Sequence, residues 1–64
     1  MTAPTLAEIE ATVERLERRY AASSHFPAYR TLCSRFATDL TDARDLALAK
    51  SAALMLIKQL EGDG

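Results

Sequence analysis

The chain has 64 residues and a mass of 7.0 kDa, which allows one small domain and excludes a two-domain protein. Hydrophobic residues make up 48% of it and charged residues 27%, with a net charge of −1, which excludes a disordered chain and a strongly basic, histone-like one. Cys33 is the only cysteine, so no disulfide within the chain can stabilise a core that the short length keeps small.

The choice of hydrophobic residues predicts an all-α protein. Alanine and leucine contribute 12 and nine residues, whereas valine and isoleucine together contribute three. Helix formers therefore dominate over strand formers. Both glycines lie at the end of the chain, at positions 62 and 64, so no hairpin turn is indicated in the interior. We expect a single helical domain over residues 1–64, with flexible ends at 1–4 and 62–64.

The first predicted helix covers residues 5–22. Its large hydrophobic residues follow one another at spacings of 3, 4, 3 and 4: Leu6, Ile9, Val13, Leu16 and Tyr20. This spacing is typical of a helix that packs along one narrow face. Thr5 and Glu8 have the spacing of a capping box, in which each side chain binds the backbone N–H of the other residue.

A second helix is predicted over residues 26–38, after a turn in which Ser23 or Ser24 is expected to cap it. Pro27 disfavours helical geometry at the residue before it and suits the start of a helix. The same hydrophobic spacing recurs in this segment, with Leu32 widening the face: Phe26, Tyr29, Cys33, Phe36 and Leu40.

The third helix is predicted over residues 42–61, with Gly62 as its left-handed cap. Small polar residues before it favour a break, because continuing the previous face would bury Lys50 and Glu61. The alternative is one continuous helix, which would make the molecule a helical hairpin. With the break, we expect a small antiparallel three-helix unit whose third helix packs through this set: Leu46, Ala49, Ala53, Leu56 and Leu60.

The third helix carries more hydrophobic residues than one packed face needs. Leu48, Ala52 and Met55 follow at i, i+4 and i+7 within its otherwise polar arc. A monomer of this size would cover only one such face, so we expect oligomerisation or another partner chain to cover the second. The predicted partner interface is Leu46, Leu48, Ala52, Met55 and Leu56.

A group of arginines forms the main charge asymmetry, and we identify it as a candidate basic docking patch: Arg15, Arg18, Arg19 and Arg30. Arginine suits two-point binding of carboxylate or phosphate groups. The simplest interpretation is that these residues complement the end of the first helix and shield the end of a hairpin. Docking onto an acidic protein surface is a second interpretation. Nucleic-acid binding is disfavoured because the whole chain is slightly acidic.

We expect no catalytic, cofactor or metal site and no small-molecule substrate. His25 and Cys33 are the only residues of their types, too few for a metal site of the usual ligand number. Cys33 lies on a hydrophobic helix face, where a thiol is usually inert packing. No Gly-rich phosphate loop and no nucleophile motif is present.

The sequence therefore predicts a non-catalytic helical protein–protein interaction module, such as a small adaptor, co-chaperone or regulatory subunit. It would associate with a protein partner or as a homo-oligomer, with a dimer favoured. The alternative is a small nucleic-acid-associated regulator that uses the arginines. We expect a cytoplasmic protein, because the chain shows no secretory signal, no apolar run of about 18 residues and one unpaired cysteine.

Overall fold

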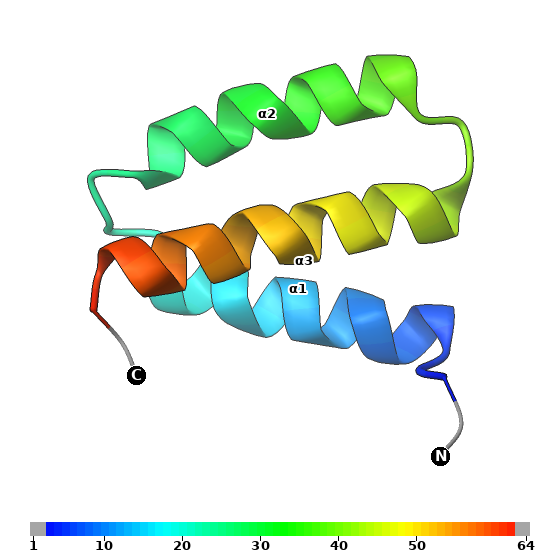
Figure 1. Cartoon of the computed structure of the whole chain (residues 1–64), viewed down its shortest axis with the longest axis horizontal. Coiled ribbons are helices and arrows are strands. Elements are labelled where there is room, and N and C mark those ends of the chain that lie inside the picture. Colours follow the sequence, from blue (N-terminus) through cyan, green and yellow to red (C-terminus); the bar gives the residue numbers. More distant parts are fainter. Residues whose placement is uncertain (1–2, 63–64) are drawn as a thin grey trace.

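The computed structural model describes residues 3–62, which form three helices: α1 (Leu6–Tyr20), α2 (Phe26–Asp39) and α3 (Ala43–Leu60). The described residues contain no strand, so the predicted all-α class is confirmed. The two connections between the helices lie at opposite ends of the molecule (Figure 1). The ends expected to be flexible, 1–4 and 62–64, lie partly outside the described residues.

The break predicted after the second helix is confirmed, and the continuous hairpin is wrong. Leu40 and Asp42 have extended backbone, with ψ of 126° at both, so helical geometry stops between α2 and α3. The predicted helix over 5–22 was too long at its end, because α1 stops at Tyr20 and a turn follows. The predicted bounds 26–38 and 42–61 each differ from the observed ones by one residue at one or both ends.

The predicted caps of α1 and α3 are present. Thr5 Oγ1 accepts a hydrogen bond from the Glu8 amide at 3.2 Å, and Glu8 Oε2 accepts one from the Thr5 amide at 3.4 Å. Gly62 ends α3 with a φ of +74°, a conformation that favours glycine. The predicted serine cap of α2 is wrong: the Ser23 hydroxyl accepts from the His25 amide, and α2 begins without a side-chain cap.

Asp42 caps α3, and its Oδ1 atom accepts hydrogen bonds from the amides of Arg44 at 2.8 Å and Asp45 at 3.4 Å. We expect Asp42→Ala to lower the free energy of unfolding by about 1 kcal/mol, because two backbone donors lose their acceptor. Chemical denaturation would measure the loss. Asp42→Asn is the matched control, since it keeps the acceptor and should retain most of the stability. Equal losses in both variants would contradict the capping role.

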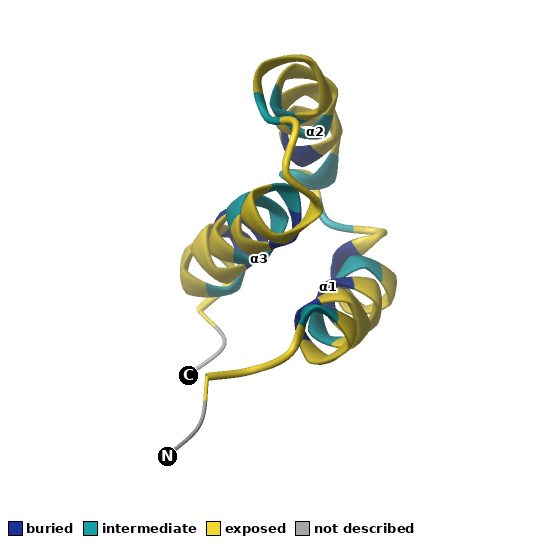
Figure 2. Cartoon of the chain, turned by 90° about the vertical axis from the view of Figure 1, so that its right-hand side faces the viewer, coloured by how far each residue is buried: buried dark blue, intermediate teal, exposed yellow. Residues whose placement is uncertain are grey.

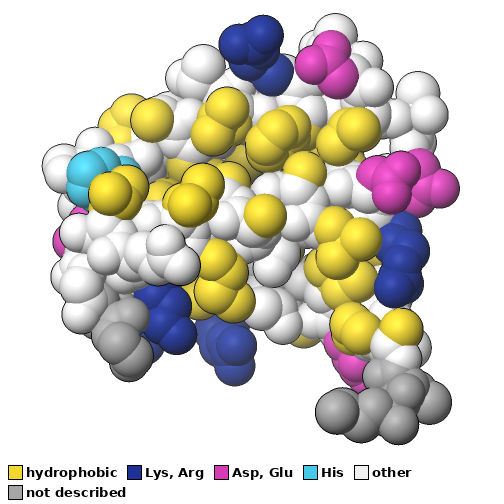
Figure 3. Space-filling view, viewed as in Figure 1, with side chains coloured by type: hydrophobic (Ala, Val, Ile, Leu, Met, Phe, Trp, Pro, Cys, Tyr) yellow, Lys and Arg dark blue, Asp and Glu magenta, His cyan; other side chains and the backbone are white. Residues whose placement is uncertain are grey.

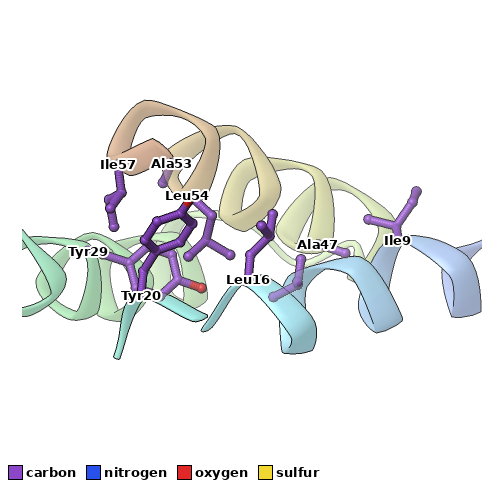
Figure 4. Close-up of a cluster of buried hydrophobic side chains, with 9 residues drawn as sticks. Ile9, Leu16, Tyr20, Tyr29, Ala47, Ala53, Leu54 and Ile57 are labelled. Carbon is purple, nitrogen blue, oxygen red and sulfur yellow. The ribbon is translucent and has the colours of Figure 1, made fainter. Parts of the chain in front are cut away.

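The core lies between α3 and the other two helices, and α1 and α2 barely touch each other (Figure 2). Leu54 is fully buried. Tyr20, Tyr29 and Leu54 gather at one end of the core, and Ile9 lies at the other (Figure 4). Nine buried residues make up this core: Ile9, Val13, Leu16, Tyr20, Tyr29, Ala47, Ala53, Leu54 and Ile57.

Tyr29 joins all three helices and is the only buried residue of α2. Its hydroxyl donates a hydrogen bond to Glu17 Oε2 of α1 at 2.7 Å. Burial raises the pKa of the Tyr29 phenol, and its contacts with Cys33 and Glu17 raise it further. The phenol is therefore protonated at neutral pH and remains a donor to the Glu17 carboxylate.

The packing face expected for the third helix is largely wrong. Of that set only Ala53 is buried, whereas Leu56 and Leu60 are 59% and 65% exposed. The buried residues of α3 are instead Ala47, Ala53, Leu54 and Ile57. The small Ala47 lies beside Val13, where it allows α3 to approach the large side chains of α1.

The molecule is flattened, with principal extents of 31 × 30 × 15 Å. α3 contacts both α1 and α2, and in the end-on view it lies to one side of them (Figure 2). Two neighbours cover two sides of α3 and leave its outer side open. The fold thus exposes part of the most hydrophobic helix on a broad face.

Candidate protein interface

The outer face of α3 carries four hydrophobic residues, which we call the α3 strip: Leu48, Ala52, Met55 and Leu56. They follow at i, i+4, i+7 and i+8, so they lie on one side of the helix. The side chains of Leu48, Met55 and Leu56 are 44%, 42% and 59% exposed. The buried residues of the same helix, among them Leu54 and Ile57, lie on the opposite side.

Figure 3 shows the broad face that contains this surface. Hydrophobic side chains gather over α3 and along its boundary with α2, and most charged side chains lie at the margins. Leu32 of α2 and Leu60 of α3 are also exposed, by 39% and 65%. A hydrophobic centre with a charged rim is the usual composition of a protein–protein contact surface.

The structure brings together four of the five residues predicted as the partner interface and separates the fifth. Leu46 is half-buried and turns toward α1, where it lines a depression of about 230 Å³ with Val13 and Ala47. This position separates it from the other four residues of the predicted interface. Leu46 lies four residues after the cap Asp42, and the strip starts only at Leu48.

Polar residues continue the strip at both ends. Asp45 precedes Leu48 by three residues and Gln59 follows Met55 by four, and both are exposed. The outer face therefore repeats the 3, 4, 3, 4 spacing that is typical of helix-to-helix packing: Asp45, Leu48, Ala52, Met55 and Gln59. Sequence reasoning missed the two polar positions, although their spacing from Leu48 and Met55 could have revealed them.

The predicted basic docking patch is gathered only in part. Arg15, Arg18 and Arg19 lie together on the exposed surface of α1, whereas Arg30 is exposed on α2. Arg18 forms an ion pair with Glu14, at 2.5 Å between Nη2 and Oε1. Lys58 of α3, which sequence reasoning missed, joins Arg15 and Arg19 around a depression of about 230 Å³.

Two of these arginines, Arg18 and Arg19, contact other side chains of α1. The Arg19 guanidinium lies 5.6 Å from the centre of the Tyr20 ring, within the range of a cation–π contact. In Arg18, the ion pair with Glu14 partly neutralises the positive charge. These contacts agree with a role in complementing the end of α1, where a positive charge opposes the helix dipole.

The residues considered for chemistry lie apart from the strip. Cys33 is half-buried against the core, and His25 is half-buried at the start of α2. Within residues 3–62, no three histidine, cysteine or acidic side chains are grouped closely enough to hold a metal ion. None of the helices in this part of the chain combines the length and hydrophobicity needed to cross a membrane.

No family model, no curated protein and no solved structure matches the chain. The surface of the molecule is therefore the basis for inferring its function.

Proposed function

We propose that this chain is a non-catalytic helical protein–protein interaction module, in the class of small adaptors, co-chaperones and regulatory subunits. The observation that carries the proposal is the α3 strip, where three large hydrophobic side chains are each more than 40% exposed on one helix face. Contiguous exposed hydrophobic surface of this kind marks contact sites in stable proteins.

The architecture supports the same proposal. Most domains bury their hydrophobic faces between packed layers, but no element of this molecule, which extends 15 Å along its shortest axis, covers the outer side of α3. In this proposal the chain is an antiparallel three-helix unit, and an associated chain supplies the missing layer over α3. Covering the strip would remove hydrophobic surface from water and stabilise the folded state.

The basic docking patch is weaker evidence of a binding surface than the strip is. Glu10, Glu14 and Glu17 alternate with the arginines along α1, so the field of this helix is mixed in sign. Binding to a nucleic-acid backbone depends on a continuous basic surface that neutralises several phosphates. The four residues of the strip, in contrast, are all uncharged.

The proposal is tested with the purified protein and with the native host extract. We expect the wild-type chain to self-associate in sedimentation velocity at micromolar concentration, or to capture a host protein. We expect the strip variant Leu48→Glu/Met55→Glu to lose that association, because it places charges of one sign within the hydrophobic contact. Circular dichroism would show that the helices remain formed.

A matched control carries the same pair of charges elsewhere. Ala7→Glu/Ala11→Glu changes two exposed alanines of α1, one helical turn apart, and leaves α3 untouched. This control should associate like the wild type. A wild-type monomer whose captured proteins are the same with and without the strip substitutions would contradict the proposed function.

A further inference from the structure

We infer that the partner of the α3 strip is the α3 strip of a second copy, packed antiparallel about a two-fold axis at Ala52. This inference rests on the proposed function, because it specifies what covers the same surface. Four observations support it: the order of side chains along the strip, the polar residues at its ends, the size of the exposed face and the small core of one copy.

The strip is self-complementary about its middle residue. Leu48 precedes Ala52 by four residues and Leu56 follows it by four, so each lies about 6 Å along the helix axis from Ala52. An antiparallel copy with its two-fold axis at Ala52 therefore places Leu48 against Leu56 of the other chain, twice. The small side chain at the axis allows the two helices to approach closely, and the leucines fill the space on either side.

The polar ends of the strip select the antiparallel direction. Asp45 and Gln59 lie seven residues on either side of Ala52, so an antiparallel pair brings the Asp45 carboxylate beside the Gln59 amide. A parallel pair would bring the two Asp45 carboxylates together, and like charges in contact are repulsive. Antiparallel helices also place opposite ends of their dipoles side by side.

The area of the face suits a dimer. A standard stable interface buries roughly 800 Å² on each partner. The broad face of this molecule measures 31 × 30 Å and can supply that area with the strip near its centre. Hydrophobic side chains also extend from α3 toward α2 on this face (Figure 3), so the contact can widen beyond the two α3 helices.

The core of one copy is small. It contains nine buried residues, two of which are alanines, and only Leu54 has a fully buried side chain. A core of this size rarely supplies more than roughly 3–5 kcal/mol. A second copy would add buried hydrophobic surface and stabilise the fold. Because every cell that makes the chain contains further copies, this stabilisation would not depend on another protein.

The first test uses charge pairs that only the proposed register brings together. In Leu48→Glu/Leu56→Lys, the introduced carboxylate of one chain faces the introduced ammonium of the other. In the matched variant Leu48→Glu/Leu56→Glu, two carboxylates face each other. We expect the first variant to dimerise at least about tenfold more tightly than the second in sedimentation equilibrium. Equal affinities would overturn the register.

The second test is a cross-link that does not depend on the charge variants folding. In a Cys33→Ser background, Ala52→Cys would place one thiol from each chain at the two-fold axis, within disulfide distance. We expect a covalent dimer after air oxidation. Ala7→Cys, at an exposed position of α1, is the matched control and should form no covalent dimer under the same conditions.

The outcomes separate this inference from the proposed function. A wild-type dimer whose Ala52→Cys variant does not cross-link would overturn the axis at Ala52 and leave an interaction module. A wild-type monomer that captures another protein through the strip would overturn the second copy only. A monomer with no binding that depends on the strip would overturn both.

Discussion

Replacement of Leu54 by alanine is expected to lower the free energy of unfolding by about 2–5 kcal/mol, because it removes a buried side chain and leaves a cavity. Among residues 3–62, Leu54 is the one fully buried side chain, at the end of the core where Tyr20 and Tyr29 meet it. The loss is comparable to the whole stability of a single core of this size. Thermal unfolding followed by circular dichroism should show a melting temperature lower by about 10 °C or more.

Leu60→Ala is the matched control for this prediction, since it makes the same substitution in the same helix at a residue that is 65% exposed. It should change stability by no more than about 0.5 kcal/mol. Both variants must be compared at the same protein concentration, because association adds to apparent stability. If the two variants lost similar stability, the observed packing of α3 would be wrong.

Tyr29→Ala is expected to cost about 3–5 kcal/mol, the range for removing a large buried aromatic side chain. α2 has no other buried residue, so its attachment to the rest of the molecule depends on this side chain more than on any other. We expect hydrogen exchange to accelerate in α2 more than in α1 or α3. Equal acceleration in all three helices would show instead that α2 does not unfold separately from the rest of the molecule.

Tyr29→Phe separates the ring from its hydroxyl. The ring would remain packed beside Phe26, 5.3 Å away between centres, but Glu17 would lose its donor. A hydrogen bond to a charged group contributes about 1.5–3 kcal/mol, so this variant should lose less stability than Tyr29→Ala. Comparing the two variants by chemical denaturation measures how much of the stability that Tyr29 contributes comes from its ring and how much from its hydroxyl.

The position of α3 links stability to the proposed function. The same helix supplies Leu54 and Ile57 to the core on one side and Leu48 and Met55 to the exposed surface on the other. A rigid helix fixed by its own core presents its outer side chains with little loss of conformational freedom on binding, which favours affinity. Substitutions in the core should therefore weaken association indirectly, and substitutions in the strip should act on it directly.

The face of α1 could be predicted from the sequence because that helix has only one hydrophobic side. Ile9, Val13, Leu16 and Tyr20 are all buried as their spacing predicts, and every charged residue of α1 lies outside this set. Its first cap was equally predictable, since the Thr5 and Glu8 contacts join residues within one turn. Local chemistry decides such features before any tertiary contact forms.

The face of α3 could not be predicted, because hydrophobic residues surround most of that helix. Periodicity allowed one packing phase through Leu56 and Leu60 and another through Leu54 and Ile57, and only the second is buried. The choice depends on where α1 and α2 dock, which no pattern within α3 contains. The surplus of hydrophobic residues in α3 could be predicted from the sequence. Four of the residues predicted to form an interface do lie together on the exposed side of the helix: Leu48, Ala52, Met55 and Leu56.

By itself, then, the sequence determined the three helices, the break between α2 and α3, and the excess of hydrophobic residues in the last helix. The tertiary structure decided that α3 packs against both other helices, that Tyr29 of α2 reaches Glu17 of α1, and that Leu46 turns toward α1. The physical reason is the range of the interactions. Helix propensity and capping act within a few residues, whereas burial depends on which side chains meet from distant parts of the chain.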